Sequence, residues 1–263
     1  MGSEEEPRPT PAMMPRRRPV IRPAQRAPAR ARFLVAMDIP RRGTQGAIVW
    51  PDTGVLLGLG TEQDLLDRFR RHYRGRIRLT ALVCRELRAL SEQPTGEASD
   101  DDYDRIMAAT RAVQTLLIGE SALPVAELGD EDLTAVGNVT EQLKALSEDP
   151  GRRHSGEAQL IVLAEKQAAL GESKHILLSN DGGASIVAGE HGISIRHIGD
   201  VLAEFACADP DLAAETCMQA FNVAIRISAP PVRSRPTNVQ AFTCARSVTG
   251  CDQCERIGRT PGS

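Results

Sequence analysis

Residues 175–184 read HILLSNDGGA, and this stretch indicates the fold class of the chain. Its apolar residues at 176–178 run into a polar segment that ends in two glycines, which is the pattern of a short buried strand closing in a turn. A strand buried on both faces belongs to a parallel sheet that is covered by helices. Such sheets bind their ligands at the carboxyl ends of the strands, and Asp181 stands at that end of this strand.

Strand and helix patterns alternate along the rest of the central region. Further strands are predicted at 47–51, 77–79 and 193–198, where apolar residues form short runs or alternate with polar ones. Helical patterns lie between the strands, at 61–73, 81–90, 103–118 and 131–146, from 155 onward, and at 199–207 and 211–223. This order is typical of parallel strands joined by right-handed crossovers, so the sequence predicts an α/β domain.

Charge divides the 263 residues into an acidic body and two basic ends. Residues 1–32 carry eight Arg against three Glu, residues 224–263 carry six Arg against two acids, and the span 33–223 stands at −12. The Pro- and Arg-rich residues 1–32 cannot bury enough surface to fold, so we expect a disordered basic arm. We expect residues 33–223 to form the domain and residues 224–263 to form a mostly irregular basic tail.

This charge distribution bears on function. An acidic body between basic ends is not typical of a helix that reads a DNA groove, and it suits a body that gathers carboxylates around metal. The arginines of the arm would either bind a nucleic-acid backbone or keep the chain in solution, and the sequence favours neither alternative. No P-loop or Rossmann fingerprint occurs, and no Ser-His-Asp or Cys-His arrangement stands out.

Hydropathy and cysteine usage predict a cytoplasmic protein that does not cross a membrane. No apolar run approaches the ~20 residues that a membrane span needs, and the acidic start of the chain lacks the apolar core of an export signal. The six cysteines follow no evenly spaced framework, which favours reduced thiols. Cys244, Cys251 and Cys254 have the spacing of part of a zinc site, but no obvious fourth ligand accompanies them.

Four acidic residues occupy positions that a parallel sheet would bring together. Asp52 and Asp181 each follow an apolar strand, Glu157 lies in the first turn of a helix, and Glu86 flanks the apolar face of another. Each alone has an ordinary explanation as a turn residue, a helix cap or a solvated acid. Together they would repel one another unless a divalent cation joined them. Hard oxygen ligands with no nearby His or Cys favour Mg²⁺ or Mn²⁺.

At these residues the sequence resembles the PIN-domain nucleases. The resemblance lies in WPDTGVLLGL at 50–59, ALVCRELRAL at 81–90, HSGEAQLIVLA at 154–164 and ILLSNDGGA at 176–184, and it covers residues 47–200. In that family an Asp after strand one, a Glu on an early helix, an acid opening a later helix and an Asp after strand four form the metal site. The matching positions are Asp52, Glu86, Glu157 and Asp181. The resemblance implies a three-layer α/β/α domain with a central parallel sheet of four to five strands.

Some features depart from the family pattern. Pro51 directly precedes the first acid, Gln159 stands where many relatives have a second acid, and the connection from 92 to 150 is long. Asp38 is a rival for the first acid, but Asp52 fits better because an apolar helix follows it at once. Asn180 could assist a metal or the scissile phosphate, although a role in the turn suits it better.

The resemblance implies a metal-dependent endonuclease that hydrolyses phosphodiester bonds, most simply in single-stranded RNA. Asp52, Glu157 and Asp181 would hold one or two Mg²⁺ or Mn²⁺ ions, and Glu86 would complete the site directly or through water. The family further suggests the toxin of a toxin–antitoxin pair, a homodimer restrained by an antitoxin protein that blocks the acidic groove. The alternative is a catalytically inactive PIN fold that acts as a protein-interaction or RNA-binding module.

Overall fold

The computed structural model describes residues 46–120, 122–147, 154–171, 174–209, 211–228 and 239–242. The predicted basic arm at 1–32, the alternative acid Asp38 and the cysteines at 244, 251 and 254 lie outside these residues. What the sequence predicts for them therefore stays a prediction.

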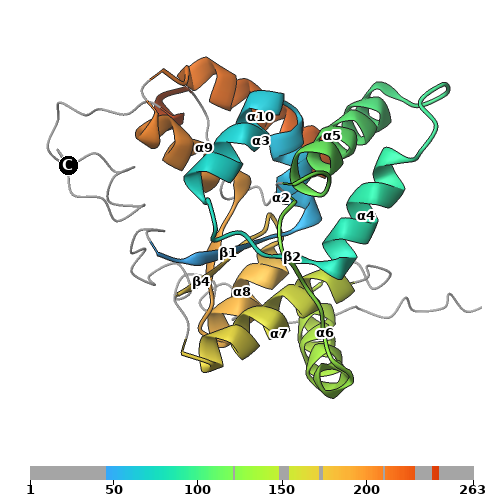
Figure 1. Cartoon of the computed structure of the whole chain (residues 1–263), viewed down its shortest axis with the longest axis vertical. Helices are drawn as coiled ribbons and strands as arrows, with labels where there is room; N and C mark the ends of the chain where they lie inside the picture. The colour runs from blue at the N-terminus through green and yellow to red at the C-terminus, as the bar shows by residue number, and fades with distance from the viewer. Residues whose placement is uncertain are drawn as a thin grey trace, which may run out of the picture.

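A parallel sheet lies at the centre of the described chain (Figure 1). Its strands β1 (Ile48–Pro51), β4 (His175–Leu178) and β5 (Ser194–Arg196) pair in the order β1-β4-β5. All residues of β1 and β4 are buried, as expected for strands that are covered on both faces. The predicted buried strand in HILLSNDGGA and the α/β fold class are therefore confirmed.

The prediction of one central sheet with four to five strands is wrong for the described residues. β2 (Leu79–Thr80) and β3 (Val125–Ala126) form a second, two-stranded parallel sheet. A single bridge between Val49 and Ile77 connects this pair to β1. The described strands thus form a three-stranded sheet and a separate two-stranded sheet, and the bridge between Val49 and Ile77 brings the chain that leads into β2 alongside β1.

Pro51 gives the physical reason for this interruption. The Val49 N–H donates to the carbonyl of Arg76, and the Arg78 N–H donates to the carbonyl of Val49. The next hydrogen bond of this parallel ladder would need an N–H at residue 51, and proline has none. On its other side β1 continues to pair, since the Asp52 N–H donates to the Leu178 carbonyl at 2.8 Å.

Helices cover the strands from two sides (Figure 1). One side carries α6 (Leu133–Leu146), α7 (Ser155–Ala169) and α8 (Gly182–Glu190). The other side carries α2 (Thr53–Gly60), α3 (Gln63–His72), α4 (Ala81–Ser91), α5 (Asp100–Leu116), α9 (Ile198–Ala208) and α10 (Ala214–Ser228). Two short 3-10 helices, η2 (Asp130–Asp132) and η4 (Val239–Phe242), complete the described elements.

The folded body extends beyond the predicted domain end at 223. Helix α10 continues to Ser228, and the ring of Phe242 in η4 lies 6.2 Å from that of Phe221 in α10. Ala224, Ile227 and Phe242 are buried members of the core. Residues 224–228 and 239–242 therefore belong to the folded body because their apolar side chains pack on it, and the mostly irregular character predicted for the rest of 224–263 stays a prediction.

Helix α2 is buried between two other helices, and its glycines permit the close approach. A Cβ atom at Gly60 would lie 2.4 Å from the carbonyl oxygen of Ala108 in α5, and one at Gly58 would lie 2.9 Å from Cβ of Ala224 in α10. Such contacts are shorter than van der Waals packing allows. The sequence GVLLGLG therefore fits a central helix that begins directly after Asp52.

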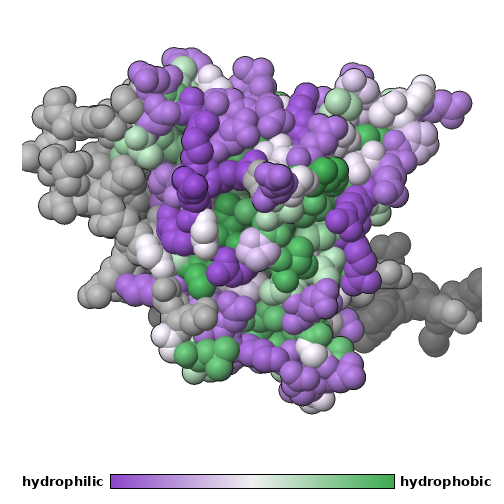
Figure 2. Space-filling view, in the orientation of Figure 1, coloured by the Kyte–Doolittle hydropathy of each residue, from purple (hydrophilic) through white to green (hydrophobic). Residues whose placement is uncertain are grey.

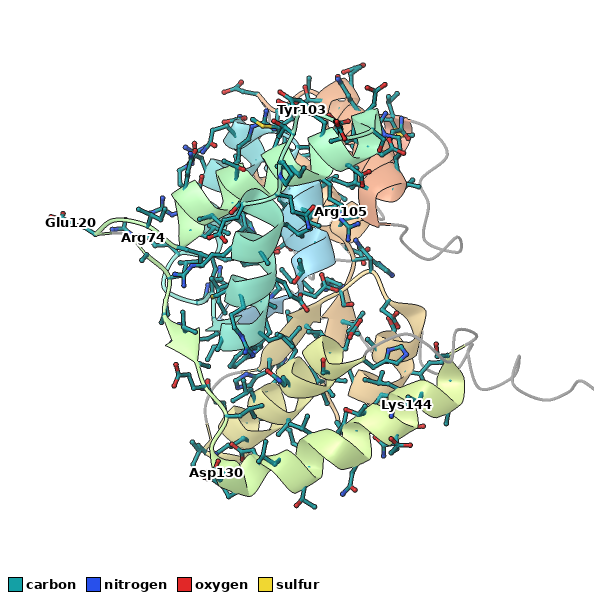
Figure 3. All side chains as sticks on the ribbon, turned by 90° about the vertical axis from the view of Figure 1, so that its right-hand side faces the viewer. Arg74, Tyr103, Arg105, Glu120, Asp130 and Lys144 are labelled. Carbon is teal, nitrogen blue, oxygen red and sulfur yellow. The ribbon has the colours of Figure 1, made fainter. Side chains whose placement is uncertain are left out.

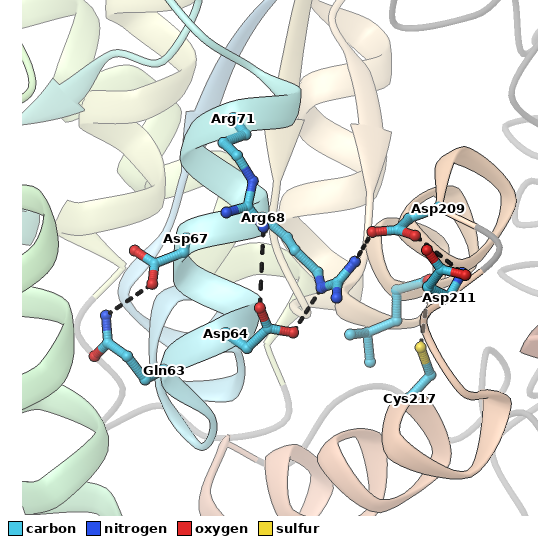
Figure 4. A network of polar contacts seen from close by, with 9 residues as sticks. Gln63, Asp64, Asp67, Arg68, Arg71, Asp209, Asp211 and Cys217 are labelled. Carbon is cyan, nitrogen blue, oxygen red and sulfur yellow. Dashed lines mark hydrogen bonds and ion pairs between the residues drawn. The ribbon is translucent and has the colours of Figure 1, made fainter.

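Polar contacts fasten the helices on the side of α3 (Figure 4). Arg68 donates to Asp64 at 2.6 Å and also pairs with Asp209 after α9. Tyr73 donates to buried Glu204 of α9 at 2.7 Å, and burial together with this carboxylate raises the pKa of Tyr73 well above its ordinary value. These contacts explain how α3 and α9 are held together.

The outer surface of the described chain is mixed in character. Figure 2 shows polar side chains surrounding a central group of apolar ones, in the part of the view where Figure 1 places β1 and β2. Of the described helices, none combines the length and the apolar character that crossing a membrane requires.

Candidate functional site

The register of the sheet places Asp52 and Asp181 at the same edge. Pro51 lies opposite Leu178, so the segments that follow β1 and β4 leave the sheet side by side. Both aspartates also cap the helices that follow them. Oδ1 of Asp52 accepts the Val55 N–H at 2.7 Å, and Oδ1 of Asp181 accepts the Ala184 N–H at 2.8 Å. Capping therefore explains one oxygen of each carboxylate and fixes its direction.

Ser179 links the two aspartates. Its buried hydroxyl hydrogen-bonds to Asp52 and accepts the Asp181 N–H at 3.1 Å. The neighbouring Asn180 accepts the Ile198 N–H through Oδ1 at 3.0 Å, so its amide ties the end of β4 to the start of α9. This agrees with the structural role preferred for Asn180, although the residue also lines the cavity described next. The sequence patterns gave no sign of the role of Ser179.

A cavity of about 720 Å³ opens at the carboxyl ends of β1 and β4. All four acidic residues singled out in the sequence line it, namely Asp52, Glu86, Glu157 and Asp181. They come from the ends of two strands, from α4 and from the first turn of α7. The structure thus brings the four residues together, and their role as metal ligands stays a prediction. Ile227 also lines the cavity, so one residue assigned by sequence to the tail forms part of its wall.

Glu86 is oriented by a neighbouring hydroxyl. The Oγ1 atom of Thr53 donates to Oε2 of Glu86. A Cβ atom built on Gly156 would lie 3.9 Å from Oε1 of Glu86, so this carboxylate lies beside the N-terminus of α7. A helix N-terminus carries partial positive charge and favours an acid. Glu86 is therefore half-buried and held in place, unlike the solvated helix acid that it would be on its own.

The electrostatics of the cavity raise the affinity of Asp52 for a proton. The pKa of Asp52 is raised from 3.8 to about 7, mainly by burial and in smaller part by the negative charge of Glu157. Hydrogen bonds from Ser179 and from the N–H groups of Val55 and Asn180 oppose this shift. A carboxyl group with such a pKa lies where negative charge is poorly compensated. A divalent cation would provide the compensation, because its charge stabilises the ionised form.

His154 is the residue that the sequence interpretation missed. A ring nitrogen of His154, a carboxylate oxygen of Glu157 and one of Asp181 all lie within 4.8 Å of one another. The side chain is buried, with 2% of its surface exposed. From the sequence we count no His near the acids, and we predict a helix from 155 onward. In the structure Ser155 is already helical and His154 occupies the cap position, where its side chain makes no capping bond. Its spacing of three residues from Glu157 was the available signal.

Arg105 is the only basic residue among the described residues that line the cavity. It is exposed on α5, in the upper half of Figure 3, whereas Lys144 lies on α6 in the lower half. The nearby Asp101 and Asp104 pair with Arg226, and the described ion pairs include none to Arg105. A guanidinium at the mouth of an acidic cavity is suited to an incoming phosphate.

Comparison of the chain with protein-family models, with curated proteins and with solved structures gives no match. The resemblance to PIN-domain nucleases therefore stays a prediction from the sequence.

Proposed function

We propose that this chain is a metal-dependent phosphodiester hydrolase with a PIN-like α/β/α arrangement, acting on single-stranded RNA. The observation that carries the proposal is the meeting of four carboxylates in one cavity at the carboxyl ends of parallel strands. Ligands of α/β sheets bind at this edge. A volume of about 720 Å³ is also within the range of small-molecule and cofactor sites, so it has room for a nucleotide.

The residues present fit a divalent cation. Asp52, Glu157 and Asp181 would hold it, with Glu86 bound directly or through water. Burial and the charge of Glu157 disfavour the ionised form of Asp52, and a bound cation would compensate its negative charge. When bound, such an ion lowers the pKa of an attacking water and stabilises the charge that develops on the phosphate. Mg²⁺ and Mn²⁺ are the ions that the carboxylates by themselves would select.

The side chains of the protein have separate tasks in this proposal. Arg105 binds the phosphate at the mouth of the cavity and aligns it. Thr53 fixes the Glu86 carboxylate, which accepts a hydrogen bond from the attacking water. Ser179 and the two capping bonds fix Asp52 and Asp181, so the charged groups need little reorganisation when substrate arrives.

The family resemblance extends the proposal to the biological role. The chain would be the cytoplasmic toxin of a toxin–antitoxin pair, working as a homodimer and restrained by an antitoxin that fills the acidic cavity. Under the alternative, the same fold is catalytically inactive and serves as a protein-interaction or RNA-binding module.

Cleavage of a fluorescent single-stranded RNA by the full chain in Mn²⁺, Mg²⁺ or EDTA tests the proposal. Wild type is compared with Asp181→Asn and with Glu190→Gln, an exposed acid at the other end of the same helix α8. We expect metal-dependent cleavage that is lost in Asp181→Asn and kept in Glu190→Gln. If all three chains are inert on several RNAs and metal leaves the melting temperature unchanged, the inactive module replaces the nuclease.

A further inference from the structure

His154 stands apart from the other histidines of the chain. All five histidines lie in described parts of the structure. His72, His191 and His197 each contact a carboxylate, and His175 accepts a hydrogen bond from Trp50 at 3.0 Å. Within the described residues neither ring nitrogen of His154 has a hydrogen-bond partner. A buried imidazole without partners is costly, so its position calls for a ligand.

The surroundings of His154 indicate what kind of ligand this is. Its nitrogen and the oxygens of Glu157 and Asp181 lie within 4.8 Å of one another. Ligand atoms that share one ion, at bond lengths of roughly 2.0–2.3 Å, lie about 3 to 4.5 Å apart. A small inward movement of these three side chains is therefore enough to place them around one cation. The two carboxylates also provide the negative charge that a cation needs.

The donor set determines which cation is preferred. Mg²⁺ takes oxygen ligands and retains several waters, whereas imidazole suits first-row transition metals. One imidazole nitrogen beside carboxylate oxygens therefore makes a mixed site that gains little with Mg²⁺. In the order of divalent affinities Mn²⁺ is the weakest of the transition series, so a preference for Mn²⁺ over Mg²⁺ is the most stringent form of the expectation.

We propose that His154 is a direct metal ligand that, with Glu157 and Asp181, makes this cavity select a first-row transition-metal ion over Mg²⁺. This inference rests on the proposed function, and it narrows the choice of ion that the acids alone leave open. It also gives the HSGE segment at 154–157 two ligands on one turn of chain, at the start of α7.

Metal binding to the metal-free full chain tests this directly, without any RNA. Calorimetric titration of wild type should give tighter binding of Mn²⁺ than of Mg²⁺. His154→Gln should weaken Mn²⁺ binding about 10- to 100-fold and should change Mg²⁺ binding little. Even substitution of residues that only hydrogen-bond to metal ligands lowers metal affinity by about this factor. His191→Gln is the matched control, since His191 contacts Glu165 away from the cavity, and it should change neither affinity.

Electron spin-echo spectroscopy of bound Mn²⁺ gives a second readout, whose result for wild type stands even if the variant fails to fold. We expect a coupling to an imidazole nitrogen, absent from His154→Gln. Mn²⁺ bound without nitrogen coupling, or with unchanged affinity in His154→Gln, would overturn the role of His154 and leave the acidic metal site intact. A wild-type chain that binds neither ion would overturn the proposed function as well.

Discussion

Helix α7 has acidic side chains near both of its ends, and their pKa values shift in opposite directions at the two ends. At the C-terminal end Lys166 donates to Glu131 at 2.9 Å and to both oxygens of Asp132 at 2.9 and 3.0 Å. These contacts lower the pKa of both carboxyls. At the N-terminal end burial and the charge of Glu157 raise the pKa of Asp52 to about 7.

The difference shows where the chain supplies its own cation. A lysine neutralises the acids at one end of α7, whereas at the other end the one basic residue among the described residues that line the cavity is the exposed Arg105, to which no described ion pair is made. Close carboxylates that form no ion pair with a basic side chain are unfavourable in the metal-free chain. Such an arrangement is expected where an external cation completes the site.

Asp52→Asn should have the largest effect on activity. Asparagine caps a helix as well as aspartate does, so α2 should still form, but a charged ligand is lost. We expect cleavage of single-stranded RNA in Mn²⁺ to fall by about 100-fold or more, comparable with removing one preorganised group from an active site. Single-turnover cleavage measures this. Asp67→Asn, a substitution on α3 outside the cavity, is the control and should cleave like wild type.

The pH dependence of stability should follow from the same residue. Between about pH 4 and pH 7 the folded chain keeps a proton on Asp52 that the unfolded chain has already released. Metal-free wild type should therefore lose stability as pH rises through this window, by at most about 1.4 kcal/mol per pH unit. Denaturant unfolding in EDTA at a series of pH values measures it.

In the same experiment Asp52→Asn should lack this loss, so that the variant is more stable than wild type above pH 7. Superimposable curves for the two chains would show that Asp52 ionises without cost. Added Mn²⁺ should reduce the difference, because the ion competes with the proton for the same carboxylate.

Arg105→Ala should have a smaller effect, since it removes a contact to phosphate and leaves the acids unchanged. We expect about a tenfold fall in kcat/KM, which corresponds to roughly 1.4 kcal/mol, with no change in Mn²⁺ affinity. Arg74→Ala, an exposed arginine far from Arg105 in Figure 3, is the matched control. A loss of metal binding in Arg105→Ala would show that the arginine supports the site itself.

Lys166→Met should have the smallest effect and the opposite pH signature. The lowered pKa values of Glu131 and Asp132 contribute stability above their unfolded values, and this contribution disappears as pH falls. We expect a slightly lower melting temperature at neutral pH, with wild type and variant converging in acid. Thermal melts at pH 7 and pH 3 measure this, and a difference that persists in acid would point to lost packing of the lysine stem.

Much of the site could be predicted from local pattern. An apolar run shows where a strand ends, and parallel strands end at a common edge, so Asp52 and Asp181 could be expected to meet. The first turn of a helix places Glu157 in the same way. The separate two-stranded sheet could not be predicted from the strand patterns. It depends on which strand lies on the side of β1 where Pro51 has no N–H to donate, and that is decided by the tertiary structure.

The sequence by itself determined the α/β class and the order of acids along the chain, because period and turn residues are local properties. Only the tertiary structure decided that Ser179 joins the two aspartates, that Arg105 reaches the cavity from α5, and that His154 is buried beside Glu157 and Asp181. Burial and the absence of a hydrogen-bond partner depend on segments far apart in the chain, and a local pattern contains no information about them.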